Sequence, residues 1–250
     1  MPYSIALAGK GGTGKTTIAG FLVAYLVGKG KVPVLAVDAD ANANFNEVLG
    51  VEVESTLGDA REEMKKGVPS GMTKDIYMEM KLQEGVIEAD GFDLVVMGRP
   101  EGSGCYCAAN SLLTMYLEKL IDNYPYMVTD NEAGMEHISR LVTNNVDLLL
   151  VISDPTKRGL QAASRIIELT KELNLSISST GVIINQVKEE HLDAVTRLAE
   201  DFNLPVEGLI PEDQDVVECD LSGKPTSSLG KENRAVAEIF KVFDRIVTAS

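Results

Sequence analysis

Short apolar segments alternate with longer segments of helical period along the whole chain. The short segments are brief and apolar, and several are rich in Val and Ile, which is typical of buried strands. The predicted strands are Tyr3–Ala8, Val32–Val37, Phe92–Met97, Tyr126–Thr129, Asp147–Ile152, Ser179–Ile184 and Val206–Ile210.

Between these strands, apolar residues recur three and four positions apart, which predicts amphipathic helices. One such face runs through Leu160, Ala163 and Ile167. The predicted helices are Thr16–Val27, Ala108–Ile121, Lys157–Leu173, Glu189–Ala199 and Lys231–Val247.

The alternation of strands and helices predicts an α/β fold with a mostly parallel central sheet flanked by helices on both faces. The segment Ser55–Glu84 is the least periodic and most charged, so we expect it to lie outside the central sheet. No internal repeat or linker divides the chain, and we expect one domain over residues 1–250.

Composition narrows the classes of function. The chain of 250 residues has 23 Lys+Arg and 38 Asp+Glu, a net charge of −15. So acidic a chain predicts no binding to nucleic acid or to an anionic membrane surface. Three Cys are too few for a disulfide framework. The first residues do not form a secretory signal, and no segment approaches the ~18 apolar residues of a membrane helix. We expect a cytoplasmic protein.

A glycine-rich segment follows the first predicted strand and opens the first helix. Residues 9–17 read Gly-Lys-Gly-Gly-Thr-Gly-Lys-Thr-Thr and satisfy G-x-x-x-x-G-K-[ST]. In this motif the backbone N–H groups of the loop cradle phosphates, Lys15 reaches the β- and γ-phosphates, and Thr16 offers a hydroxyl to Mg²⁺. A glycine-rich turn without a ligand is the alternative. The sequence predicts a nucleotide site that includes Gly11, Gly12, Thr13, Gly14, Lys15, Thr16 and Thr17.

This loop contains an additional lysine, Lys10, directly after its first glycine. With this lysine, the loop resembles the deviant Walker A motif of the MinD/ParA/nitrogenase-iron-protein class of ATPases. The resemblance continues in Val37-Asp38-Ala39-Asp40 and in the D-x-x-A-G pattern of residues 130–134. Asn185-Gln186 and Ile210-Pro211-Glu212-Asp213 are similar to the base-binding segments of that class. The landmarks follow the order of the class from residue 5 to residue 213.

This resemblance implies ATP and Mg²⁺ as cofactors, and it implies site residues. Lys10 would act across a homodimer interface on the ATP of the partner subunit, and Asp40 would position the attacking water. Asp38 and Asp130 would lie near Mg²⁺, mostly through water. The base-binding positions would be Asn185, Pro211 and Glu212. For Asp130 and Glu132 the alternative is a helix N-cap with an acidic first turn.

A close pair of cysteines, Cys105 and Cys107, follows the third predicted strand. The simpler interpretations are that the pair consists of two thiols without a function or that it forms a small redox couple. Two thiolates cannot complete a tetrahedral soft-metal site, but a two-fold dimer would present the pair twice and supply four.

Together with the deviant Walker A motif and residues 130–137, this pair resembles the CooC/AcsF type of nickel-inserting ATPases. That resemblance implies Ni²⁺ or Zn²⁺ held between two C-x-C loops, with apo carbon monoxide dehydrogenase or apo acetyl-CoA synthase as the partner.

Two other classes remain as alternatives: a positioning ATPase of the MinD or ParA kind, and a reductase like the nitrogenase iron protein. The last predicted helix mixes basic and acidic residues, unlike a membrane-targeting helix. The iron protein has a cluster-binding Cys in the stretch that corresponds to the residues after Asp130, and this sequence has none there, which disfavours the reductase. We expect His137 to be a helix-face residue and assign no role to Cys219.

Overall fold

The computed structural model describes residues 1–42, 44–98, 114–117, 119–133 and 145–247. Its strands form one eight-stranded sheet in the order β3-β4-β2-β5-β1-β6-β7-β8. β3 pairs antiparallel with β4 and every other pairing is parallel, which confirms the predicted α/β class. The strands are β1 (Tyr3–Gly9), β2 (Val34–Ala39), β3 (Val86–Ala89), β4 (Phe92–Val96), β5 (Tyr126–Asn131), β6 (Asn145–Ser153), β7 (Ser176–Val187) and β8 (Val206–Pro211).

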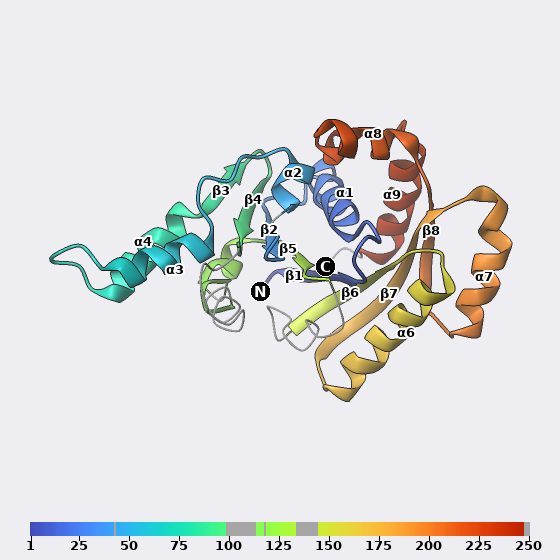
Figure 1. Cartoon of the computed structure of the whole chain (residues 1–250), viewed down its shortest axis with the longest axis horizontal. Helices are drawn as coiled ribbons and strands as arrows, with labels where there is room; N and C mark the ends of the chain where they lie inside the picture. The colour runs from blue at the N-terminus through green and yellow to red at the C-terminus, as the bar shows by residue number, and fades with distance from the viewer. Residues whose placement is uncertain (43, 99–113, 118, 134–144, 248–250) are drawn as a thin grey trace.

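Helices cover both faces of the sheet (Figure 1). On one face α1 (Lys15–Gly28), α2 (Phe45–Leu49) and α9 (Arg234–Ile246) pack on apolar side chains that alternate along β1, β2, β5 and β6. On the other face α6 (Lys157–Glu172) and α7 (Leu192–Asp201) cover β6 and β7, and residues 114–117 cover β2 and β4. Because both faces are covered, the central strands are almost wholly apolar.

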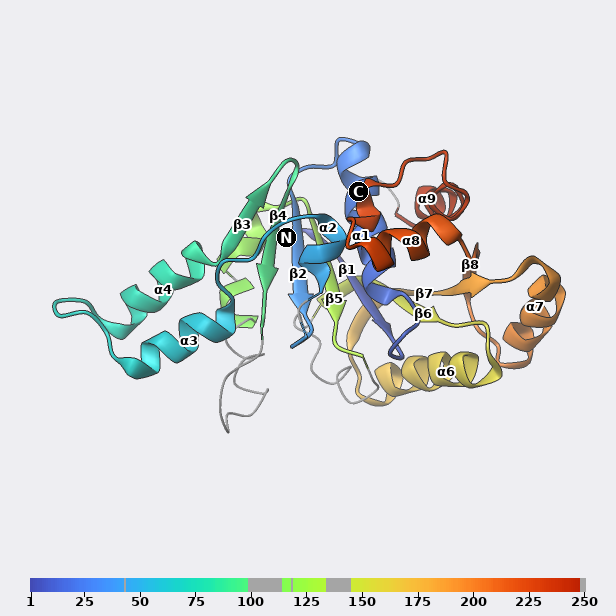
Figure 2. The same cartoon turned by 45° about the horizontal axis from the view of Figure 1, so that its top comes forward.

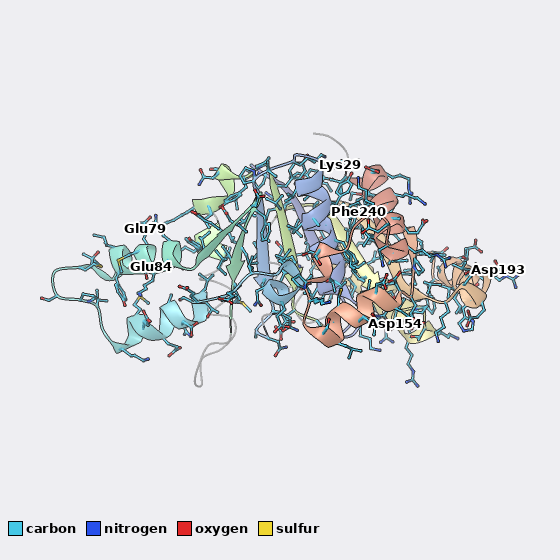
Figure 3. The ribbon with its side chains drawn as sticks, turned by 90° about the horizontal axis from the view of Figure 1, so that it is seen from above. Lys29, Glu79, Glu84, Asp154, Asp193 and Phe240 are labelled. Carbon is cyan, nitrogen blue, oxygen red and sulfur yellow. The ribbon has the colours of Figure 1, made fainter. Side chains whose placement is uncertain are left out.

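The contact between α1 and α9 is aromatic. Tyr25 on α1 lies with its ring centroid 5.3 Å from that of Phe240 and 5.4 Å from that of Phe243 on α9. Lys29, at the end of α1, places its ammonium group 5.4 Å from the centre of the Tyr25 ring. Figure 3 shows Lys29 beside Phe240 at this junction. These contacts fix the helix that follows the glycine-rich loop against the end of the described chain.

Two helices, α3 (Leu57–Lys66) and α4 (Lys74–Glu84), project beyond the β3 edge of the sheet (Figure 2). Thr56 and Asp59 form a capping box that starts α3. The hydroxyl of Tyr116 donates a buried hydrogen bond of 2.6 Å to the carbonyl of Leu82, which joins the end of α4 to residues 114–117. The segment Ser55–Glu84 therefore lies outside the sheet, as predicted.

The structure adds elements to the prediction and shifts others. β3, α2, α3, α4 and α8 (Gln214–Ser222) are not in the predicted set. The predicted helix Glu189–Ala199 is a 3-10 turn over Glu189–His191 followed by α7. Of the predicted helix Ala108–Ile121, the described residues 114–117 and 119–120 are helical, and a 3-10 turn begins at Ile121. No helix in the described part of the chain is long and apolar enough to cross a membrane.

Candidate functional site

The candidate site lies at the carboxyl edge of the sheet, where ligands bind in open parallel sheets. The glycine-rich loop leaves β1 there and enters α1, which confirms the predicted strand–loop–helix context. β5 lies between β1 and β2, and its register pairs Asp130 with Leu7 on one side and with Asp38 on the other. The topology thus brings together the loop after residue 9 and two of the predicted carboxylates.

Close approach and backbone conformation fix two glycines of the loop. Gly14 has φ 80°, in the left-handed region, where it stands as the N-cap of α1. A Cβ at Gly14 would also collide with the side-chain amide of Asn185, and a Cβ at Gly9 would collide with the carbonyl oxygen of Ile152 on β6. Only glycine fits either position, so the loop passes close to the ends of β6 and β7.

The loop lysine is held by an ion pair inside the protein. Nζ of Lys15 lies 3.0 Å from Oδ1 of Asp130, and the side chains are 6% and 1% exposed. Burial raises the pKa of Asp130, and the Lys15 charge and a hydrogen bond from Thr16 oppose that rise. Removing one partner of a buried ion pair leaves the other charge buried without compensation, which is strongly unfavourable. A ligand that binds Lys15 in place of Asp130 therefore requires a new partner, or a proton, for the Asp130 carboxylate.

Asp38 is the second buried carboxylate. Its Oδ2 accepts a hydrogen bond from the backbone N–H of Phe45, and its Oδ1 accepts one from the N–H of Asp40, both at 3.0 Å. Burial raises the pKa of Asp38 to about 7, and the nearby charge of Asp130 adds to that rise, although the two N–H donors oppose it. Its main-chain carbonyl accepts a bond from Met97 N at 2.9 Å, the first residue after β4.

These donors fit a magnesium ion. Mg²⁺ commonly binds through one or two carboxylates together with phosphate oxygens and water. Here Asp38 and Asp130 supply two buried carboxylates, and the hydroxyl of Thr16 hydrogen-bonds to the carboxylate of Asp130. An ion there would also neutralise two buried acids whose charged forms are disfavoured by burial.

The predicted catalytic residues Lys10 and Asp40 are more accessible. Lys10 is exposed on the loop, and its carbonyl accepts a hydrogen bond of 3.0 Å from the hydroxyl of Thr13. Oδ1 of Asp40 accepts one of 2.8 Å from the N–H of Asn42. Gly11 and Gly12 are exposed, and Thr16 and Thr17 are partly exposed. The catalytic roles of Lys10 and Asp40 stay predictions.

A pocket of about 220 Å³ opens beside the loop. Nδ2 of Asn185 donates a hydrogen bond of 3.0 Å to the carbonyl of Thr13, so the opposite edge of the amide is left to accept a hydrogen from a ligand. The pocket is lined by Gly14, Thr17, Ile18, Phe21, Asn185, Gln186, Ile210, Pro211, Glu212, Asp213, Val216, Val217 and Ala235. The structure therefore gathers the predicted base-binding residues Asn185, Pro211 and Glu212 in one pocket with an apolar floor.

Sequence reasoning placed Asp213 in a base-binding segment but missed its capping role, and it missed Asn233. Oδ1 of Asp213 caps α8 by accepting from the N–H groups of Asp215 and Val216, and it also accepts a bond of 2.8 Å from Nδ2 of Asn233. Oδ1 of Asn233 in turn caps α9 through the N–H of Val236. Asp213 lies two residues after the last strand and is followed by Gln-Asp-Val-Val, which is an N-cap signal that could have been used.

The predicted metal ligands Cys105 and Cys107, and His137, lie outside the described residues. Cys219 is a free, buried thiol on α8.

The fold and the loop define a P-loop ATPase. Residues 4–226 match the family model of the CobQ/CobB/MinD/ParA nucleotide binding domain, and the chain belongs to that family. Known structures share the fold: a chain of the MinC:MinD cell division protein complex of Aquifex aeolicus has a TM-score of 0.75 at 22% identity, covering 99% of this chain and 96% of that one. MinD of Pyrococcus horikoshii, solved with Mg-ADP, has a TM-score of 0.71 at 23% identity, covering 98% of this chain and 96% of that one.

Among relatives in sequence, an uncharacterized ATP-binding protein of Methanocaldococcus jannaschii is 42% identical over 248 residues, 97% of this chain and 98% of that protein. The carbon monoxide dehydrogenase accessory protein CooC of Rhodospirillum rubrum is 32% identical over 187 residues, 68% of this chain and 70% of that protein. The septum site-determining protein MinD of Thermotoga maritima is 26% identical over 234 residues, 90% of this chain and 81% of that protein.

Proposed function

We propose that this ATPase is a metallochaperone. Two copies close around ATP, hold Ni²⁺ or Zn²⁺ between their Cys105 and Cys107 thiolates, and deliver nickel to apo carbon monoxide dehydrogenase or apo acetyl-CoA synthase. The observation that carries the proposal is the hydrogen bond from Met97 N to the carbonyl of Asp38. It joins the main chain at Met97, eight residues before Cys105, to the main chain of Asp38, whose carboxylate is buried in the nucleotide site.

The relation to CooC supports the cargo. An accessory protein of carbon monoxide dehydrogenase and this chain share 32% identity over two thirds of both sequences. Thiolates are soft ligands that accept Zn²⁺ and Ni²⁺ alike, so the ligand type alone does not select the metal. A shared site between two protomers would let opening of the dimer release the ion.

The nucleotide chemistry of the proposal uses the described site. Water attacks the γ-phosphorus of ATP, the bond to the β–γ bridging oxygen breaks, and ADP leaves. Lys15 would move from Asp130 to the phosphates, and Asp40 would orient the water. Lys10 of each protomer would reach the nucleotide of its partner. Mg²⁺, held by Thr16 and the two buried carboxylates, would neutralise charge on the phosphates.

Metal stoichiometry tests the proposal. The protein is purified without oxygen, loaded with Ni²⁺ or Zn²⁺ with and without ATP, and analysed for metal per chain. We expect about one ion per two chains from the symmetry of a shared site. The double variant Cys105→Ser/Cys107→Ser should lose it, and Cys219→Ser, a change at a buried thiol on α8, should keep it. Equal metal in the double variant and the wild type would overturn the four-thiolate site.

A positioning ATPase is the second candidate, favoured by the 26% identity with MinD of Thermotoga maritima over 234 residues. The structure argues against membrane targeting by α9, because its apolar residues Val236, Ile239 and Phe243 are fully buried in the core. Sedimentation with anionic vesicles in the presence of ATP separates the two candidates, because only the positioning ATPase is expected to bind them. A [4Fe–4S] absorption spectrum would favour the reductase instead.

A further inference from the structure

The outer face of α8 carries two apolar side chains that the protein itself does not bury. Val217 is 50% exposed and Leu221 is 84% exposed. They are four residues apart on one helix, so they lie on the same side, one turn from each other. Isolated exposed leucines are ordinary, but a pair at helical spacing forms the beginning of a contact stripe.

A pocket of about 490 Å³ lies beside Leu221 of this stripe, and Val217 lines the adjoining nucleotide pocket. Leu221, Leu229 and the buried Cys219 give it apolar walls, and Asp215 and Glu218 are acidic residues that line it. The stripe and the pocket together offer a place where the apolar side chains of another segment can enter and be covered.

The surroundings of the pocket are acidic. Residues 212–223 contain five Asp and Glu and no Lys or Arg. In the part of the chain that the structure describes, Glu218 and Asp220 make no side-chain hydrogen bond or ion pair, and Asp215 has only the amide of Asn233, at 3.3 Å. Lys224 is the one basic residue lining the pocket. The negative field around the stripe is therefore largely uncompensated within the described structure.

We propose that this surface, formed by Asp215, Val217, Glu218, Asp220 and Leu221 and called here the α8 surface, binds a basic amphipathic segment of a partner protein. Apolar residues of the segment would cover Val217 and Leu221, and Lys or Arg side chains would pair with the surrounding carboxylates. The proposal does not depend on metal delivery.

The charge decides between this occupant and two others. A second copy docked by two-fold symmetry would set the same acids against each other, at a cost from like-charge contact. An anionic membrane would be repelled for the same reason. α8 also borders the nucleotide pocket, because Asp213 both lines that pocket and caps the helix. Val217 itself lines the nucleotide pocket, so a partner that covers it would dock at the edge of that pocket.

Fluorescence anisotropy with a defined probe tests the α8 surface. The probe is a labelled 14-residue helical peptide with Leu on one face and Lys on the other. The control peptide has the same sequence with every Lys replaced by Glu. At low ionic strength the Lys peptide should bind and the Glu peptide should not. Leu221→Ser and Glu218→Lys should each weaken binding about tenfold or more, the order expected for a buried contact or a reversed charge. Both side chains are exposed, so neither change should alter the fold.

The matched controls lie at the end of α6, where Leu173 is 40% exposed and Glu172 is exposed. Leu173→Ser and Glu172→Lys should leave binding unchanged. The proposal would be overturned if the controls lost peptide binding as strongly as the α8 variants, or if Leu221→Ser bound the peptide as tightly as the wild type. Either result would show that the Lys peptide is attracted to the acidic protein as a whole and not to the α8 surface. Self-association or binding to anionic vesicles that disappears in Leu221→Ser would assign the surface to another occupant and would also overturn it.

Discussion

The ammonium group of Lys15 and the carboxylate of Asp130 form an ion pair of 3.0 Å that is almost completely shielded from water. Lys15 is also the side chain that the motif assigns to the β- and γ-phosphates of ATP. We therefore expect the nucleotide to replace Asp130 as the partner of Lys15. The carboxylate released in this way would then be available to a divalent cation.

Removing the charge of Asp130 should destabilise the nucleotide-free protein and favour nucleotide binding without metal. In Asp130→Asn, Lys15 is left buried without its partner, which typically costs about 3–5 kcal/mol. ATP in excess EDTA should then raise the unfolding midpoint of the variant more than that of the wild type. Thermal unfolding with and without ATP measures both effects.

The exposed ion pair between Lys29 and Asp244, at 2.6 Å, provides the control. Asp244→Asn should cost less than about 1 kcal/mol, because exposed pairs contribute little. Equal costs in Asp130→Asn and Asp244→Asn would show that burial of the first pair has no energetic weight.

Asp38 should make the metal-free protein less stable as pH rises toward neutrality. Its pKa is about 7 in the folded protein, against an ordinary value of 3.8. Between these values the folded state holds a proton that the unfolded chain has released, so stability falls as pH rises from about 4 to about 7 and then levels off. One pKa unit corresponds to about 1.4 kcal/mol, which limits the effect to a few kcal/mol.

Urea unfolding in EDTA between pH 5 and 8 measures this dependence. Asp38→Asn has no carboxyl to titrate, so the difference in free energy of unfolding between variant and wild type should change across this range. A constant difference would mean that Asp38 ionises in the folded protein as it does in the unfolded chain.

Asn185→Ala should weaken nucleotide binding by about tenfold, because the substitution removes the hydrogen bond to Thr13 O and a polar group of the pocket. Calorimetric titration with ADP and Mg²⁺ gives the affinity. As a control, Asn174→Gly changes an exposed asparagine at φ 51°, at the end of α6, and should bind normally. An unchanged affinity for Asn185→Ala would remove this residue from the binding site.

Gly9→Ala should destabilise the protein by about 1–3 kcal/mol, the usual cost of overpacking, because the new methyl group meets the carbonyl of Ile152. Gly28→Ala, at the last residue of α1, is the matched substitution. Nothing lies within 4 Å of a Cβ at Gly28, so that variant should be as stable as the wild type or more stable. Chemical denaturation measures the free energy of unfolding of both variants. The prediction is wrong if Gly28→Ala is less stable than Gly9→Ala.

Asp40→Ala should bind ATP and lose hydrolysis, because its carboxylate is expected to orient the attacking water and not to hold the phosphates. Steady-state phosphate release and nucleotide titration separate the two properties. Wild-type turnover in this variant would contradict the assignment.

Much of the fold follows from the apolar pattern, because the buried strands of a doubly covered sheet are continuous apolar runs. β3 was missed because Val86–Ala89 is a partly exposed edge strand with a Glu in its middle. α8 was missed because only Cys219 of its nine residues is buried, so the helix has no apolar period to detect. Its structure depends on the caps at its ends.

The local part of the site was predictable, and the long-range part was not. The motif identifies Lys15 and Thr16 by spacing alone. Sequence order suggests that Asp38 and Asp130 follow strands, but their direct pairing depends on β5 lying between β1 and β2. No local pattern shows that Lys15 is paired with Asp130 across 115 positions.

The shared oxygen of Asp213 has a mechanical consequence. Because it caps α8 and receives the amide of Asn233, which caps α9, the two helices start from one joined point. α9 in turn places Ile239 and Phe243 in the largest apolar cluster. The wall of the nucleotide pocket on this side is thus anchored to a closely packed apolar core. We therefore expect any movement on nucleotide exchange at Lys15, Asp38 and Asp130, whose partners and charges would change when nucleotide and metal bind.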